Sequence, residues 1–374
     1  MEKLRFREHF GTVETIKPHE GYIHNVGRAL TITILGTLCG LKNITRILQW
    51  AKAPQVRTFL QENFEIYELP SKRWLGNLLA IIKPESLNEK FMVWSKTMLP
   101  EFLDGLTISF DGKTICSTGK MGEYEKPLHI LSAHLAELGL TMGQQTVDEK
   151  SNEIPAMQEL LKLVDIRGCM VVADALNCQT KTAETIIDCG GDYLLNAKGN
   201  QETLEEDIKD YVNDNELRSD METESTREKN GGRIEFRRAY VSHDVSWMVE
   251  HLPKWRGLAC FGAINRRVTK NGHTSDEWHF YISSCKLTAS ELLYYARNEW
   301  SIESMHWILD VHFGEDSCRT RDKNANQVLN IVRKIVINNL HEYQRSTGSK
   351  APLTELMFSC LLDCSQILNL MNWQ

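Results

Sequence analysis

The sequence predicts an α/β fold in which a mixed sheet is preceded by a small helical domain and interrupted by a β-strand insertion. Apolar residues recur at helical spacing throughout residues 1–100. From 106 to 212 short apolar strands alternate with helices, and from 233 to 284 the pattern is of strands alone. We therefore expect a helical N-terminal domain over 1–100 and an α/β domain over 101–374, with the insertion at about 213–287.

The N-terminal hundred residues predict helices over 26–41, 44–50, 55–61 and 75–82. Prolines interrupt this pattern at Pro54, Pro70 and Pro84. Ser71 stands where it can cap the last of these helices. Lys72 and Arg73 beside that cap could contact a phosphate, but a capped turn explains them more simply. We assign no chemistry to this domain.

Two of the predicted strands are each followed by an aspartate. Leu106–Phe110 alternates apolar and polar residues and leads into Asp111, while the apolar run Cys169–Ala173 leads into Asp174. An Asp-Gly pair such as Asp111-Gly112 is by itself more typical of an ordinary turn. Carboxylates at the ends of two strands, however, can hold a divalent ion at the edge of a sheet.

A third carboxylate comes from a late helix. Thr288 can cap a helix that runs toward Trp300, so that Glu303 falls on its continuation or just after a break. We expect Asp111, Asp174 and Glu303 to converge at one end of the sheet. Two divalent ions bound there could serve phosphoryl chemistry.

The order of the elements narrows the fold further. Three strands come first, the last two joined in a hairpin at Gly139, and an alternation of helices and strands follows. Antiparallel strands followed by β-α-β crossovers are the order of a ribonuclease-H-like domain, in which acids at strand ends bind metal. The later strands flank Asn271-Gly272, a hairpin signal, and form the predicted insertion.

Composition and cysteine usage predict a globular, cytoplasmic protein. The chain has 374 residues, of which 42% are apolar and 25% charged. Its ten cysteines are scattered without a Cys-x-x-Cys pair, as is typical of reduced thiols. The longest apolar stretch, Ala29–Leu41, is too short to cross a bilayer, and no signal peptide is evident. We therefore predict no membrane association.

The net charge of −7 argues against a polyanionic partner, but its distribution weakens the objection. Ten acidic residues and only two basic ones fall between Gln201 and Glu224. Basic residues cluster elsewhere, and each cluster fits either a solvated face or a nucleic-acid contact. The clusters are Arg227, Lys229, Arg233, Arg237 and Arg238; Arg266, Arg267 and Lys270; and Arg319, Arg321, Lys323, Arg333 and Lys334.

A series of short motifs occurs in a distinctive order and spacing along nearly the whole chain. They are Asp111-Gly112-Lys113-Thr114, Val147 to Ile154, Asp174 to Gln179, Gly190 to Tyr193 with Lys198 to Gln201, Trp300 to Glu303, His306 to Val311 and Glu315 to Arg321. Together they resemble the H-repeat-associated branch of bacterial insertion-sequence DDE transposases. The resemblance implies a ribonuclease-H-like catalytic core with a β insertion behind a small helical domain.

The resemblance also implies a function. It makes Asp111, Asp174 and Glu303 the catalytic triad, with Mg²⁺ or Mn²⁺ as cofactor, for cleavage and strand transfer at insertion-element ends. The expected partner is double-stranded DNA, both element ends and target, bound by a homo-oligomer. Side chains in the matching motifs that could contact DNA are Lys113, Lys150, Lys198, Asn200, Gln201, Arg319 and Arg321. For Asn200 and Gln201, capping a turn is an equally good explanation.

Several positions depart from the family pattern. Relatives often carry Arg where this chain has Cys116, and His-Asp-Thr where it has Lys72-Arg73-Trp74. The wider DDE group has Arg and Lys where this chain has Glu299 and Asp310, although Asp is usual at the second position in this branch. An acid at 299 would repel a DNA phosphate. These departures motivate a second hypothesis, that of a catalytically silent, domesticated or degraded transposase-derived protein that at most binds DNA.

Four further side chains near the triad carry expectations. We expect Trp307 to be a core residue and His306 to be either a support for the metal ligands or solvated. The Glu315-Asp316 pair could be mistaken for another metal site. Beside Arg319 and Arg321 it is better explained as an ion-paired turn.

Overall fold

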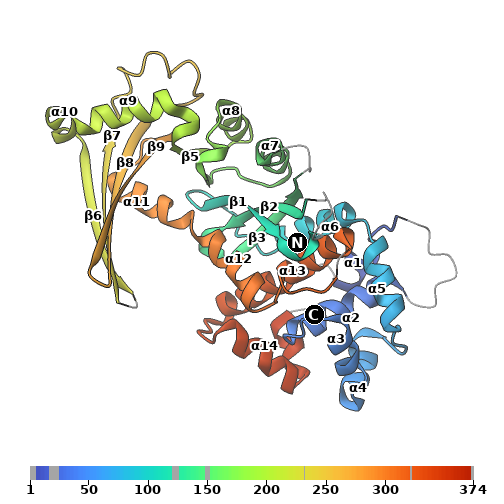
Figure 1. Ribbon diagram of the computed structural model, residues 1–374. Helices are drawn as coiled ribbons and strands as arrows, with labels where there is room; N and C mark the ends of the chain where they lie inside the picture. Colours follow the sequence, from blue (N-terminus) through green and yellow to red (C-terminus); the bar gives the residue numbers. More distant parts are fainter. Residues whose placement is uncertain are drawn as a thin grey trace.

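A single sheet of nine strands runs through the computed structural model, which describes residues 6–16, 25–119, 126–147, 152–230, 232–320 and 322–371 (Figure 1). The strand order is β3-β2-β1-β4-β5-β9-β8-β7-β6. The core strands are β1 Thr107–Ile115, β2 Leu128–Leu135, β3 Leu140–Thr146, β4 Met170–Ala173 and β5 Asp192–Ala197. The inserted strands are β6 Glu222–Asn230, β7 Arg233–Ser242, β8 Cys260–Lys270 and β9 His273–Ser283.

The five core strands have the ribonuclease-H-like arrangement. β1 pairs with β2 antiparallel and with β4 parallel, β2 pairs with β3 antiparallel, and β4 pairs with β5 parallel. The predicted hairpin turns at Gly139, whose φ of 64° lies in the left-handed region that glycine adopts without strain. The predicted fold class is therefore confirmed.

The β insertion continues the core sheet, because β9 pairs antiparallel with β5. The predicted Asn271-Gly272 hairpin joins β8 to β9, and both turn residues have positive φ, 51° and 79°. Sequence reasoning missed β6. Its residues, Glu222 to Asn230, are all polar or charged, so they show no apolar alternation from which a strand could be predicted.

Helices cover both faces of the sheet. Val171 and Ala173 of β4 belong to the apolar core beneath α7 Glu153–Leu163, α8 Thr180–Asp188 and α9 Glu202–Asn213, which α10 Asn215–Ser219 follows. Met170 and Val172 point the other way, into a smaller core with α11 Ala289–Asn298. This alternation is the period of a strand buried on both faces.

The helical region has its own core, in which α13 Lys323–Thr347 packs against helices from the N-terminal hundred residues (Figure 1). Apolar residues from both ends of the chain share this core. The domain boundary predicted at residue 100 stays a prediction. The N-terminal helices are α1 Phe6–Gly11, α2 Val26–Leu38, α3 Ile44–Ala51, α4 Pro54–Phe64, α5 Lys72–Ile81 and α6 Pro84–Lys96. The other C-terminal helices are α12 Ser301–Val311, α14 Leu353–Leu362 and α15 Ser365–Met371.

Two further features bear on the sequence predictions. None of the described helices is both long and apolar enough to cross a membrane. The ten cysteines are all free thiols.

Candidate active site

Asp111 and Asp174 occupy matching positions on neighbouring strands. The last parallel pair between β1 and β4 is Phe110 with Ala173, and each aspartate is the next residue along its chain. Adjacent strands lie about 4.8 Å apart, so the two carboxylates start from neighbouring backbone positions. Asp111 does not end its strand as we expected, because β1 continues to Ile115 in pairing with β2 alone.

The loop after Asp174 is held by hydrogen bonds. Asp174 Oδ1 accepts from the backbone N of Asn177 at 3.3 Å and from its Nδ2 at 3.0 Å. Asn200 Nδ2 donates to the carbonyls of Ala175 at 2.5 Å and Cys178 at 3.3 Å, and Gln201 Nε2 donates to Cys178 at 3.0 Å. Asn200 and Gln201 thus brace this loop, which is the capping role weighed above; their contact with DNA stays a prediction.

Glu303 lies in the first turn of α12, after a break in the helical path. α11 starts with a capping box between Thr288 and Glu291 and ends at Asn298. The carbonyl of Asn298 accepts a 3.0 Å hydrogen bond from Ser109 Oγ of β1, which ties the break to the strand that carries Asp111. The break, rather than a continuous helix, brings Glu303 to the two aspartates.

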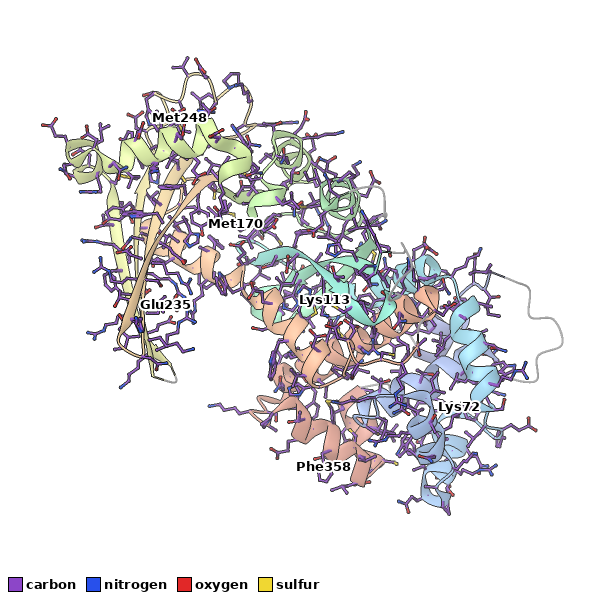
Figure 2. The ribbon with its side chains drawn as sticks, viewed as in Figure 1. Lys72, Lys113, Met170, Glu235, Met248 and Phe358 are labelled. Atoms are coloured by element: carbon purple, nitrogen blue, oxygen red, sulfur yellow. The ribbon has the colours of Figure 1, made fainter. Side chains whose placement is uncertain are left out.

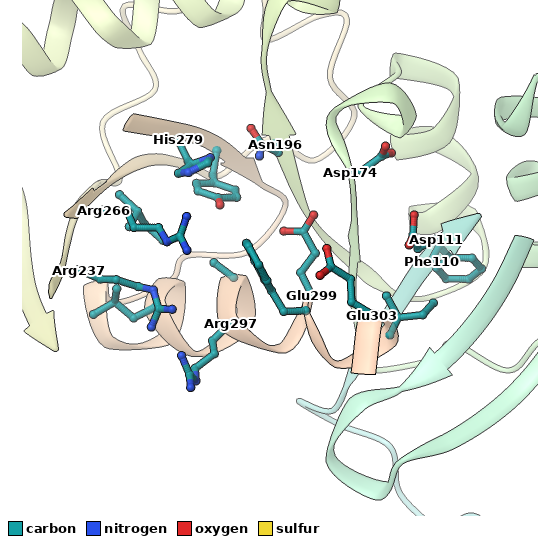
Figure 3. Close-up of a pocket in the computed structure, with 16 residues that line it drawn as sticks. Phe110, Asp111, Asp174, Asn196, Arg237, Arg266, His279, Arg297, Glu299 and Glu303 are labelled. Atoms are coloured by element: carbon teal, nitrogen blue, oxygen red, sulfur yellow. The ribbon is translucent and has the colours of Figure 1, made fainter. Parts of the chain in front are cut away.

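Asp111, Asp174 and Glu303 line one cavity of about 180 Å³ together with Glu299 (Figure 3). Burial, with further contributions from Asp174, Asp111 and Glu303, raises the pKa of Glu299 to about 8. Burial also raises the pKa of Asp174, helped by Glu153 and Asp111, although the hydrogen bonds from Asn177 oppose the rise. The cavity therefore gathers carboxylates that repel one another's charge.

The donor chemistry of this cavity fits a hard divalent cation. Carboxylate oxygens are preferred ligands of Mg²⁺ and Mn²⁺, and a cation would relieve the repulsion that the raised pKa values report. In the described part of the chain no three Asp, Glu, His or Cys side chains are arranged to hold a metal ion as they stand. Binding would therefore require these side chains to move closer together.

His306 follows Glu303 on α12 and lies beside Asp111. Its Nδ1 is 3.4 Å from Asp111 Oδ2, and its Nε2 is buried with no hydrogen-bond partner among the described residues. Of the two roles considered for His306, the geometry favours that of a support for the carboxylate.

Sequence reasoning missed a second group of side chains beside Asp111. His129 Nε2 lies 2.6 Å from Glu153 Oε1, and its Nδ1 lies 2.8 Å from Thr114 Oγ1. A Cβ at Gly112 would come within 2.4 Å of both Glu153 Oε1 and His129 Nε2. Gly112 is thus required for close packing rather than for a turn. Glu153 lies in the Val147 to Ile154 motif, and this was the sequence signal that could have indicated the group.

Lys113, a predicted DNA contact, is largely buried among acids. Its Nζ lies 2.8 Å from Asp310 Oδ1, 3.4 Å from Asp316 Oδ1 and 3.6 Å from Glu315 Oε2. Burial lowers the pKa of Lys113, but the hydrogen bond to Asp310 and the charges of the other two acids outweigh it and raise the pKa above its ordinary value. These contacts hold β1 against the end of α12.

Glu315 is ion-paired, as we expected of the Glu315-Asp316 pair, but with Lys113 and Arg333 rather than with Arg319. Arg321, the other cation of that expectation, lies outside the described residues. Glu315 is fully buried and accepts hydrogen bonds of 2.9 Å from both Arg333 and Asn330 of α13. The chain turns this carboxylate inward, where a cation on the neighbouring helix neutralises it. Arg319 is exposed.

The expectation that Trp307 is a core residue was wrong, because its side chain is 55% exposed. Its ring makes an edge contact with His312, at 4.9 Å between ring centroids. The buried face of α12 is formed instead by Ile302, Met305 and Leu309. Of the remaining DNA-contact candidates, Lys198 is exposed, and Lys150 and Arg321 lie outside the described residues.

Comparison with known proteins gives the family. A model described as transposase DDE domain matches residues 103–339, and one described as DDE_Tnp_1-associated matches residues 7–95. The chain therefore belongs to the transposase DDE domain family.

Named relatives agree with this assignment. The "H repeat-associated putative transposase YhhI" of Escherichia coli strain K12 is 29% identical over 345 residues, which cover 90% of each chain. The "Putative transposase YncI" of Escherichia coli O157:H7 is 32% identical over 286 residues, or 75% of this chain and 73% of that one. A cryo-EM structure of a piggyBac transposase synaptic complex with hairpin DNA has a TM-score of 0.48 at 11% identity, covering 98% of this chain and 80% of that one. We draw nothing further from a likeness of that size.

Proposed function

We propose that this protein is a DNA transposase that cleaves DNA at the ends of its insertion element and transfers the cut strand to a target. The observation that carries the proposal is the common cavity lined by Asp111 of β1, Asp174 after β4 and Glu303 of α12. Membership of the transposase DDE domain family supports the same reaction class.

Asp111, Asp174 and Glu303 would hold Mg²⁺ or Mn²⁺. When bound, two such ions would activate water or a DNA 3′-hydroxyl and stabilise the leaving oxygen of an in-line displacement at phosphorus. The protein orients the ligands: Asn177 hydrogen bonds to Asp174, and His306 lies beside Asp111. No covalent bond between protein and DNA is needed in this scheme.

The partners follow from the reaction. We propose double-stranded DNA, first the element ends and then the target, bound by a homo-oligomer that brings two ends together. The cytoplasm is the proposed compartment, in keeping with the ten free cysteines.

The test is a cleavage assay. A supercoiled plasmid that carries the genomic sequence on both sides of the reading frame is incubated with the protein and Mg²⁺ or Mn²⁺. We expect nicks with 3′-hydroxyl ends at the boundaries of the element, and none with the Asp111→Asn variant. Intact plasmid after incubation of folded wild-type protein with either ion would contradict the proposal.

The alternative, a silent protein that only binds DNA, is less well supported. It rests on Cys116, Glu299 and the Lys72-Arg73-Trp74 segment. Glu299 faces the triad, and Figure 2 shows Lys72 in the helical region, well away from Lys113 on β1. Ser71 caps α5 through Trp74, so this segment has a structural role. Folded protein that binds element ends and never nicks them would favour the alternative.

A further inference from the structure

The cavity that holds the carboxylates has a second, basic end. Arg237 of β7, Arg266 of β8 and Arg297 of α11 line it opposite Asp111 and Asp174 (Figure 3). The first two belong to the β insertion. Arg237 and Arg266 belong to basic clusters in the sequence, but the sequence did not indicate that they share a cavity with the carboxylates.

Arg237 and Arg266 face each other directly across the β7·β8 pair. Like charges at opposed positions of neighbouring strands are destabilising, so this arrangement needs negative charge close by. One buried carboxylate supplies part of it: Glu235 Oε1 lies 2.5 Å from Arg237 Nη2 and accepts a 2.6 Å hydrogen bond from Arg266 Nε. Burial lowers the pKa of Arg237, and the charges of Arg297 and Arg266 lower it further.

The other acids around this cluster do not complete the neutralisation. Arg297 pairs with Glu228 at 2.9 Å and Arg266 with Glu277 at 3.3 Å. The two glutamate side chains are 41% and 54% exposed, so water screens both ion pairs and they contribute little. Each guanidinium has five N–H donors, and its contacts with these glutamates leave several of them for a ligand in the cavity. Arg266 also lies over the ring of Trp300, 5.2 Å from its centroid, which fixes its plane.

We propose that Arg237, Arg266 and Arg297 bind a backbone phosphate of the DNA strand whose neighbouring phosphodiester lies at the carboxylates. This inference rests on the proposed function. Guanidinium groups recognise phosphate oxygens through paired, charge-assisted hydrogen bonds. A cavity of about 180 Å³ is too small for a duplex, so it admits one strand locally. The carboxylates at the other end of the cavity repel that phosphate, which favours its position beside the three arginines.

The test measures binding of a labelled thymidine oligonucleotide of about 12 residues, without added metal, from about 50 to 200 mM salt. Arg297→Gln and Arg266→Gln should each weaken binding roughly tenfold. Each should also reduce the slope of log K against log salt by about 0.7. Arg267→Gln is the matched control, because Arg267 is the next residue on β8, pairs with Asp276 and does not line the cavity.

Because Glu235 is buried, the test needs one further variant. Arg266→Gln removes one of the cations that neutralise the buried Glu235. If the melting temperature of this variant falls, the Arg266→Gln, Glu235→Gln double variant is measured in its place. Arg297 is half exposed and its replacement leaves no buried charge. Arg297→Gln can therefore be measured without a compensating change.

Four outcomes separate the possibilities. Unchanged affinity and salt slope in Arg297→Gln and in the folded Arg266 variant would overturn the inference, and so would an equal loss in Arg267→Gln. Competition by inorganic phosphate at the oligonucleotide's own phosphate concentration would indicate a free-anion site and would overturn it too. Arginine-dependent binding without any metal-dependent nicking would instead reject the proposed function and leave the phosphate site standing.

Discussion

At the scale of single residues, the site is defined by carboxylates that line one cavity and raise one another's pKa. Burial and the charges of Glu153 and Asp111 raise the pKa of Asp174. A raised carboxyl pKa means that the folded state holds a proton that the unfolded state has released, so ionisation of Asp174 disfavours the fold as pH rises through its pKa. A carboxyl group in a structural ion pair would have a lowered pKa, so the raised pKa of Asp174 supports the proposal that this residue binds a cation.

Asp174→Asn should therefore leave stability unchanged or slightly higher at pH 8 while it abolishes binding of Mn²⁺. The amide can still accept the hydrogen bonds that Asn177 donates. Thermal melts and calorimetric titration with Mn²⁺ measure the two effects separately. A variant that melts far below wild type would assign Asp174 to the scaffold.

Gly112 gives a second prediction at this scale. In Gly112→Ala the new methyl group would overlap Glu153 and His129, so the pair must shift beside Asp111. We expect a loss of about 1–3 kcal/mol, as for other overpacked sites, together with weaker metal binding. Gly76→Ala is the control, because nothing lies within 4 Å of its Cβ position in α5, and it should gain up to about 1 kcal/mol. Chemical denaturation compares them, and equal stability of Gly112→Ala and wild type would refute the packing argument.

At the scale of elements, a buried charge network fixes the helix of Glu303 against the strand of Asp111. Lys113 of β1 contacts Asp310 at the end of α12, and Glu315 joins Lys113 to Arg333 of α13. The network replaces apolar packing at the point where three elements meet. Glu315 and Arg333 are buried, so removing one of them leaves the other without compensation.

Glu315→Gln should accordingly destabilise the protein by about 3–5 kcal/mol, because Arg333 then remains buried without a counter-charge. Asp316→Asn is the matched control. The Asp316 side chain is 39% exposed, so its loss should change the free energy of unfolding by less than about 1 kcal/mol. Urea denaturation of both variants checks the difference. Similar small losses in the two would show that the buried network does not hold the elements together.

The contact between α13 and the sheet carries a pH dependence. Lys334 donates 2.7 Å hydrogen bonds to Ser132 of β2 and Gln144 of β3, and burial lowers its pKa to about 7. Between pH 7 and its ordinary pKa the unfolded state therefore holds a proton that the folded state lacks, so this lysine makes stability rise with pH.

Lys334→Met removes that contribution. Its stability relative to wild type should fall by about 1.4 kcal/mol per pH unit between pH 7 and pH 9 and stay level below pH 7. Denaturation curves of both proteins at pH 6, 7, 8 and 9 give this difference, in which the other titrating groups cancel. A constant difference over the whole range would mean that Lys334 stays charged in the folded protein.

At the scale of the whole molecule, the sequence predicts most of the core and little of what surrounds it. Apolar strands, the Gly139 and Asn271-Gly272 turns and the caps at Ser71 and Thr288 are local signals, and the structure contains each of them. The shared cavity of Asp111, Asp174 and Glu303 could be expected because strand order determines which strand positions are neighbours.

The missed features depend on contacts that no local pattern encodes. β6 is entirely polar, and its pairing with β7 becomes visible only in three dimensions. Trp307 looked like a core residue, but the helix rotates it outward once Ile302, Met305 and Leu309 take the buried face. The inward turn of Glu315 and the meeting of Arg237 with Arg266 likewise result from tertiary packing.

The most direct test of the central claim is manganese anomalous diffraction from crystals of the protein soaked in Mn²⁺. The account predicts anomalous peaks between the carboxylates of Asp111, Asp174 and Glu303, which draw together around the ion, and loss of these peaks in Asp174→Asn. Peaks bound elsewhere, or a cavity that stays without manganese at saturating concentration in well-ordered crystals, would contradict the assignment of these three residues as the metal ligands.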